Sequence, residues 1–146
     1  MARIRISVPD HFSFSTELAV RITDINYGNH AGNDAILAML HEVRMQFLAH
    51  HGYTELQCGG VGLIMSDVAI EFKKELFYGD IVTAKITATD WWEKGFEFNY
   101  LLEKQVAGSA IVAVKAKSGM LCYDYAAKKI VSVPAEVQQR LAGAVE

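Results

Sequence analysis

Several polar residues that are able to do chemistry lie close together in residues 23–33, TDINYGNHAGN. Asp24 carries a carboxylate that can activate water, and His30 carries an imidazole, the side-chain group best suited to acid–base work near neutral pH. The amide of Asn26 cannot act as a base or nucleophile at neutral pH, but it can orient water or donate a hydrogen bond. The segment therefore combines acid–base and hydrogen-bonding groups within one Gly- and Asn-rich loop.

These residues also have purely structural explanations. Asp beside Gly and Asn commonly shapes a loop through an Asx-turn, and a hydrogen bond to the backbone is an equal alternative for His30. Asn33 precedes an apolar periodic segment and is predicted to be the N-cap of a helix, with Asp34 favoured by the positive end of the helix dipole. The free N–H groups at Asn33 and Asp34 could at the same time stabilise a developing negative charge. Both kinds of role are open for each residue.

The segment after Asn33 has the periodicity of a long helix. Its apolar stripe comprises Ile36, Leu40, Val43 and Phe47, widened by Leu37 and Leu48. The opposite side is also largely apolar and carries Ala35, Ala38, Met39 and Glu42. His50, His51 and Gly52 are expected to end the helix. We therefore expect protein to surround the helix on most of its surface.

The remaining segments alternate as strands do. Strands are predicted in residues 3–8, 17–22, 64–72, 82–88, 96–102 and 110–125, the last with a bulge near Gly119. Turns are expected at Gly79-Asp80, Lys94-Gly95 and Gly108, and a short helix follows Pro134. This order predicts an α+β fold in which an antiparallel β-sheet wraps around one long central α-helix. The long final strands are candidates for pairing across a dimer axis.

Composition limits the other possibilities. The chain has 146 residues, which suits one domain spanning 1–146, and 51% of them are hydrophobic. A formal net charge of -3 argues against a broad nucleic-acid-binding surface. The two cysteines are far apart, and the histidines lack metal-ligand spacing, so neither a disulfide framework nor a metal site is expected. No signal peptide or membrane segment is apparent, and a cytoplasmic location is expected.

Four stretches together resemble the 4-hydroxybenzoyl-CoA thioesterase family. They are VRITDINYGNHAGNDAILAMLHEVRMQFL, VAIEFKKELFYGDIVTAKI, TDWWEKGFEFNYLLEK and SVPAEVQQRL, and they span residues 17–141. The resemblance implies the hotdog fold, a homodimer or homotetramer, and an acyl-CoA site at the subunit interface. Coenzyme A would enter as part of the substrate, and no separate cofactor is implied. An acyl carrier thioester is the alternative substrate, and neither nucleic acid nor membrane is expected as a partner.

The resemblance also implies site residues. Asp24 and His30 match the family's loop motif, and Asn33 matches its last Asn. Glu42 and Arg44 match the acidic and basic positions of the helix. Lys94 matches a hairpin position that contacts the nucleotide of coenzyme A in some members.

Asn26 departs from the family pattern. It stands where members with a known mechanism have an Asp that attacks the thioester or activates water. Another carboxylate could take over, either Asp24 or Glu42. Glu42 lies about 14 Å along the helix from Asn33, so it would come from the partner subunit or else serve in an ion pair.

Three functions follow from this pattern. The first is an acyl-CoA thioesterase whose helix N-terminus polarises the thioester carbonyl at a subunit interface. The second is a non-catalytic acyl-thioester-binding protein, which would need no loop carboxylate. The third is an enoyl-CoA hydratase-like enzyme, whose D-x-N-P-x-H motif Asp24 and Asn26 match, although Tyr27 replaces Pro and His30 comes one position late.

Overall fold

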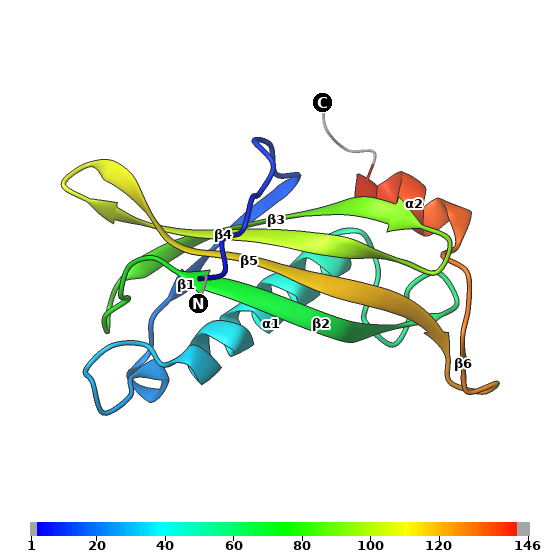
Figure 1. The fold of residues 1–146 in the computed structure, drawn as a ribbon, viewed down its shortest axis with the longest axis horizontal. Coiled ribbons are helices and arrows are strands. Elements are labelled where there is room, and N and C mark those ends of the chain that lie inside the picture. The colour runs from blue at the N-terminus through cyan, green and yellow to red at the C-terminus, as the bar shows by residue number, and fades with distance from the viewer. Residues whose placement is uncertain (1–2, 143–146) are drawn as a thin grey trace.

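The computed structural model describes residues 3–142 and contains one long helix and one sheet (Figure 1). In chain order the elements are β1 (Phe14–Ala19), the 3-10 helix η1 (Ile22–Asp24), α1 (Asn33–His50), β2 (Gly62–Phe72), β3 (Ile81–Trp92), β4 (Gly95–Val106), β5 (Ser109–Asp124), β6 (Lys129–Ile130) and α2 (Ala135–Ala142). Among the described residues, neither helix has the length and hydropathy needed to cross a bilayer.

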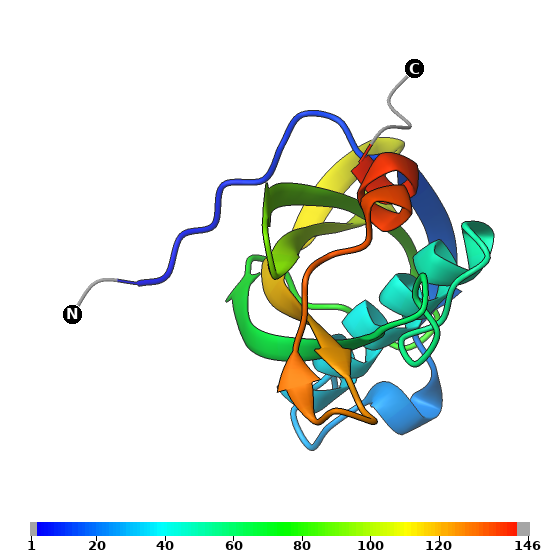
Figure 2. The same cartoon turned by 90° about the vertical axis from the view of Figure 1, so that its right-hand side faces the viewer.

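The sheet is antiparallel throughout, with strand order β1-β3-β4-β5-β2, and β6 pairs with the end of β5. It curves around one side of α1, as the turned view in Figure 2 shows. The predicted α+β class and the hotdog arrangement, a sheet rolled around one central helix, are therefore confirmed. The turns predicted at 79–80, 94–95 and 108 separate β2 from β3, β3 from β4 and β4 from β5.

The core lies between α1 and the concave face of the sheet. The helix contributes Ile36, Leu40, Val43, Phe47 and Leu48, which are all 3% exposed or less. Phe98 of β4 packs edge-on against Phe47, with ring centroids 5.8 Å apart. Each such buried side chain stabilises the fold by about 1.5–3 kcal/mol relative to exposure. The periodic stripe read from the sequence is thus the buried face.

The other side of α1 is more open than predicted. Ala35 and Met39 are buried, but Leu37, Ala38 and Glu42 are exposed in one chain. Among residues 3–142 no strand covers that stripe, because the sheet closes around only one side of the helix. The expectation of an almost fully enclosed helix is wrong for a single chain.

Two strand predictions at the N-terminus need correction. Residues 3–13 form no regular strand, and the N–H of Ile6 bonds to the carboxylate of Glu71 at 2.9 Å instead of to a neighbouring backbone. Alternation alone could not show that this segment lacks a strand partner. The strand expected at 17–22 is β1, which starts at Phe14 and ends at Ala19, because η1 follows it.

The edges of the sheet are β1 and β2, so the long final strands, predicted as candidates for pairing across a dimer axis, do not lie at an edge. β5 lies between β4 and β2. The irregularity expected at Gly119 falls on its partner, since the register of β2 shifts between Met65 and Asp67 opposite Met120 and Gly119.

Candidate functional site

The loop between β1 and α1 is held by its own backbone. The side-chain oxygen Oδ1 of Asn26 accepts a hydrogen bond from the N–H of Gly28 at 2.9 Å, which closes an Asx-turn. The N–H of Asn26 donates to the carbonyl of His30 at 3.0 Å, and the N–H of Gly32 donates to the carbonyl of Asp24 at 3.1 Å. The N–H of Ala31 reaches out of the loop to the carbonyl of Leu76 at 2.8 Å. These hydrogen bonds hold the conformation of the loop and connect it to the segment between β2 and β3.

The helix begins one residue earlier than its predicted cap implies. Gly32 is the N-cap, with extended backbone angles, and Asn33 is the first helical residue. The prediction that Asn33 caps the helix is therefore wrong. Because glycine has no side chain, no side-chain hydrogen bond caps α1. The N–H groups of the first turn and the positive end of the helix dipole thus face outward at Asn33 and Asp34.

A cavity of about 440 Å³ opens beside this helix start, and we call it the loop cavity. Its lining consists of Asn26, His30, Ala31, Asn33, Ile36, Phe72, Lys73, Lys74, Glu75, Leu76 and Val114. The loop and the first turn of α1 form one wall, and the end of β2 with the residues after it forms the other. Three of the predicted site residues therefore meet at one cavity.

His30 is oriented by two oxygen atoms. Its Nδ1 lies 3.2 Å from the carbonyl oxygen of Ala31, and its Nε2 lies 3.3 Å from Oε2 of Glu75. Both neighbours can only accept, so the tautomer with its hydrogen on Nδ1 donates to Ala31 and leaves Nε2 able to take a proton beside Glu75, whereas the tautomer with its hydrogen on Nε2 donates to Glu75. The carboxylate of Glu75 then stabilises the imidazolium that forms. His30 both contacts backbone, as its structural explanation required, and forms part of a potential acid–base pair.

Sequence reasoning missed Glu75. It follows β2 in a charged stretch, Lys73-Lys74-Glu75, which is indistinguishable in sequence from a solvated strand end. Only the antiparallel path that returns β2 past the helix start brings this carboxylate to His30. No local pattern could have indicated that pairing.

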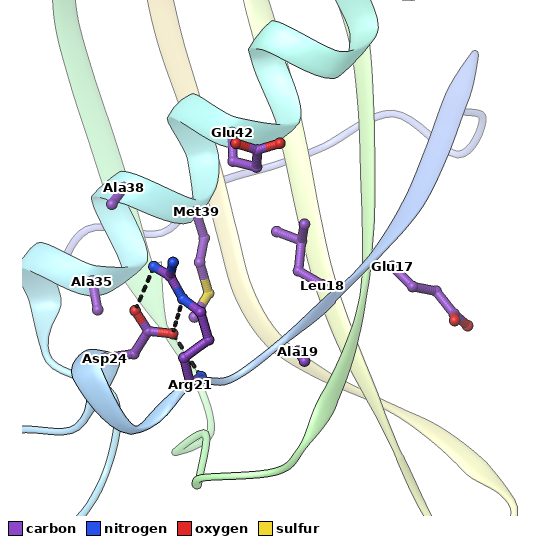
Figure 3. A pocket seen from close by; sticks show the side chains of 9 residues that line it. All are labelled: Glu17, Leu18, Ala19, Arg21, Asp24, Ala35, Ala38, Met39 and Glu42. Carbon is purple, nitrogen blue, oxygen red and sulfur yellow. Dashed lines mark hydrogen bonds and ion pairs between the residues drawn. The ribbon is translucent and has the colours of Figure 1, made fainter.

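Asp24 lies at a different cavity, the β1 cavity, of about 510 Å³ (Figure 3). Its carboxylate accepts a hydrogen bond from the N–H of Arg21 at 2.8 Å and pairs with the Arg21 guanidinium at 3.2 Å. These contacts close η1, and the hydrogen bond to Asp24 raises the pKa of Arg21. The side chain of Asp24 is only 6% exposed, and it shapes the loop through Arg21 and not through the Asx-turn that its structural explanation predicted, which Asn26 forms instead.

Glu42 lines the same β1 cavity, above Met39 in Figure 3. It is exposed and accepts a hydrogen bond from Nε2 of Gln46 at 2.7 Å. Within one chain the two carboxylates considered as substitutes, Asp24 and Glu42, therefore share one cavity, whereas Asn26, His30 and Asn33 share the other.

Lys94 lies at the opposite end of the sheet from the loop. It forms the hairpin between β3 and β4, and its carbonyl accepts the N–H of Cys122 at 3.0 Å. The other end of β3 lies near the loop, where the N–H of Val20 donates to the carbonyl of Asp80 at 2.9 Å. The length of β3 separates Lys94 from the loop cavity of its own chain.

Arg44 belongs to a buried polar chain. Its Nε donates to Glu55 at 2.8 Å, its Nη1 donates to the hydroxyl of Tyr100 at 3.1 Å, and that hydroxyl is 2.7 Å from the hydroxyl of Ser118. These bonds tie α1 to β4, β5 and the loop after the helix. The network satisfies buried polar groups and does not reach the loop cavity.

The cysteines do not supply a nucleophile. Burial raises the pKa of the Cys58 thiol to about 12 and that of Cys122 to about 11, so both stay protonated at neutral pH. In residues 3–142 no group of three or more His, Cys, Asp or Glu side chains is arranged to hold a metal ion. The chemistry available at the loop cavity is that of an imidazole, a carboxylate, amide donors and a helix N-terminus.

Comparisons with known proteins agree with this geometry. The family model of the thioesterase-like superfamily matches residues 20–141. A 1,4-dihydroxy-2-naphthoyl-CoA thioesterase from Synechocystis is 21% identical, with a TM-score of 0.77 over 88% of this chain and 94% of that one. A 4-hydroxybenzoyl-CoA thioesterase mutant complexed with 4-hydroxybenzoyl-CoA is 13% identical, with a TM-score of 0.80 over 88% and 98%. A hypothetical protein from Aquifex aeolicus is 23% identical, with a TM-score of 0.77 over 88% and 98%. No curated protein sequence matches this chain.

Proposed function

Because the chain belongs to the thioesterase-like superfamily, we propose that it is an acyl-CoA thioesterase that works at the loop cavity. The observation that carries the proposal is the start of α1, which has no side-chain cap and opens onto a cavity holding His30 and Glu75. Two of the structural relatives are named as CoA thioesterases, which supports the same substrate class.

The start of α1 supplies the donors to the thioester carbonyl. Negative charge develops on the carbonyl oxygen during attack, and the N–H groups of Asn33 and Asp34 together with the helix dipole stabilise it. Asn26 adds a third donor, because its Oδ1 is held by Gly28 and its NH2 group is left free. A Cβ placed on Gly32 would lie 3.5 Å from Nδ2 of Asn26, so this amide is next to the helix start.

His30 serves as the general base. A water molecule gives one proton to Nε2 of His30 while its oxygen attacks the carbonyl carbon, and Glu75 stabilises the imidazolium. The tetrahedral intermediate then breaks its carbon–sulfur bond. The imidazolium returns the proton to the thiolate, so the products are a carboxylic acid and the free thiol of coenzyme A. In this scheme Asn26 donates a hydrogen bond and no carboxylate is needed at its position.

We also propose a homo-oligomer, a dimer or tetramer, that forms through β2. Within the described part of the chain this edge strand pairs only with β5, and it exposes Met65, Val68 and Phe72, which are 40%, 37% and 49% accessible. An open edge with apolar side chains favours pairing with a second copy. Phe72 lines the loop cavity, so such pairing would enclose one side of it.

The test is release of free thiol from a panel of acyl-CoAs by the wild type, His30→Gln and Glu75→Gln. His11→Gln is the matched control, because His11 is exposed and lies in the segment before β1. A general base contributes about 100-fold or more, so His30→Gln should lose most turnover and Glu75→Gln a smaller part, while the control keeps it. Full activity in His30→Gln would refute the assigned base.

A non-catalytic acyl-thioester-binding protein is the second candidate, and the amide at Asn26 favours it. Saturable binding of acyl-CoA without thiol release by the wild-type protein would select this function over hydrolysis. Binding would then use the same donors at the start of α1, without the proton transfer assigned to His30.

A further inference from the structure

The segment before β1 forms a third cavity with the end of β2. It has a volume of about 230 Å³ and is lined by Arg3, Ile4, Arg5, Glu71, Phe72 and Lys73. We call it the N-terminal cavity. Ile6 anchors the segment, since its side chain is only 6% exposed and its N–H bonds to Glu71 at 2.9 Å. The two arginines are thus held beside the sheet although no strand pairing holds the segment.

The N-terminal cavity has an excess of positive charge. Its one carboxylate, Glu71, is already engaged by the N–H of Ile6 and by Nζ of Lys73 at 3.5 Å. The hydrogen bond from Ile6, followed by the charge of Lys73, lowers the pKa of Glu71. Within residues 3–142, no ion pair joins Arg3 or Arg5 to a carboxylate. The guanidinium groups of Arg3 and Arg5 are therefore available to bind an anion.

This cavity is next to the loop cavity. Phe72 and Lys73 line both of them. The N–H groups of Lys73 and Lys74 both donate to the carbonyl of Ala113, at 2.8 Å and 3.1 Å, so the backbone at the junction is fixed to β5. The basic cavity therefore lies beside the loop cavity, on the other side of Phe72 and Lys73.

We propose that Arg3, Arg5 and Lys73 bind the phosphate groups of the coenzyme A portion of the substrate. This inference rests on the proposed thioesterase function and extends it to the far end of the substrate. Guanidinium groups bind phosphate oxygens through paired, charge-assisted hydrogen bonds, and Lys73 adds a point charge. The assignment differs from the hairpin position of Lys94, which lies at the other end of the sheet.

Calorimetric titration with coenzyme A and with pantetheine, which lacks the phosphates and nucleotide, tests the assignment without requiring turnover. The double variant Arg3→Ser/Arg5→Ser should bind coenzyme A about tenfold or more weakly, a loss of about 1.4 kcal/mol, and should bind pantetheine like the wild type. The control Lys128→Ser/Lys129→Ser removes the same charge from the exposed turn at β6 and should bind coenzyme A within about twofold of the wild type.

Unchanged coenzyme A binding in the arginine variant overturns the inference. So does an equal loss of pantetheine binding, or a loss seen in Lys94→Ala and not in the arginine variant. An effect of the arginines confined to an acyl carrier protein substrate overturns it as well. If the wild type releases no thiol from any acyl-CoA but still binds coenzyme A through the arginines, the proposed hydrolysis fails and this inference stands.

Discussion

Oδ1 of Asn26 accepts a hydrogen bond from the N–H of Gly28 at 2.9 Å, which leaves the NH2 group of the same side chain beside the start of α1. The residue that departs from the family's catalytic pattern is therefore placed to act as a donor. Its chemistry differs from that of a carboxylate, since an amide stabilises negative charge on a neighbouring oxygen and a carboxylate opposes it.

Asn26→Asp should lower kcat/KM for acyl-CoA about 100-fold, because the loss of one donor to an oxyanion costs about that much and a negative charge would face the carbonyl oxygen. Steady-state kinetics measure the change. Gln138→Glu on α2 is the control for added charge, since Gln138 is exposed and distant from both ends of the loop. A faster Asn26→Asp enzyme would show instead that the reaction uses a carboxylate at this position.

Gly32→Ala should reduce activity more than stability. A Cβ at Gly32 would lie 2.6 Å from Oδ1 of Asp34 and 3.5 Å from Nδ2 of Asn26, so it would displace the groups at the helix start. The backbone φ of -76° suits alanine, and the poorer N-cap should cost about 1 kcal/mol or less. We expect kcat/KM to fall about tenfold while the urea midpoint changes little. A parallel loss of fold and activity would contradict this reading of the helix start.

Arg44→Ala and Tyr100→Phe should be coupled in stability. Removing Arg44 deletes its bonds to the buried hydroxyl of Tyr100 and to the carboxylate of Glu55, which keep only Ser118 and His41 as partners, and this costs about 3 kcal/mol. Tyr100→Phe leaves Arg44 and Ser118 each short of one partner, which costs about 1–2 kcal/mol. Because both changes break one network, the double variant should lose less than the sum, by about 0.5 kcal/mol or more, in denaturant unfolding. Strict additivity would argue against a connected chain.

Glu71 should make the free energy of unfolding depend on pH in the acidic range. Its pKa is lowered in the folded protein, chiefly by the hydrogen bond from Ile6, so the charged form is favoured by folding. That contribution is fully present above the ordinary glutamate pKa of about 4.3 and disappears as the pH falls through the lower folded value. Glu71→Gln should therefore be less stable than the wild type at pH 7, and the two proteins should converge below about pH 4. Urea unfolding at both pH values measures this, and a gap that persists in acid would exclude the ionised carboxylate as its source.

The fold was predictable because local pattern and tertiary structure agree at its main elements. The stripe containing Ile36, Leu40 and Phe47 could only serve a long buried helix, and it does. The turns at 79–80, 94–95 and 108 contain glycines, two of which, Gly79 and Gly108, adopt positive φ. Such positions are visible in sequence because few other residues tolerate them.

The incorrect predictions have a common cause. The partner of a strand and the spatial neighbours of a residue depend on the fold of the whole chain and not on local sequence. Residues 3–8 alternate as an edge strand would, yet Ile6 bonds to a side chain. The sequence order of Asp24 and Asn26 suggested one site, yet they line different cavities. The partner of His30 proved to be Glu75, which becomes its neighbour only after β2 has formed.

The hydrogen bond from the N–H of Ala31 to the carbonyl of Leu76 connects the loop before α1 to the segment that follows β2. A displacement of the end of β2 would therefore move the loop before α1, where the proposed cleavage of the thioester takes place. If the proposed pairing through β2 forms, the rate of thioester hydrolysis should therefore fall when dilution separates the two copies.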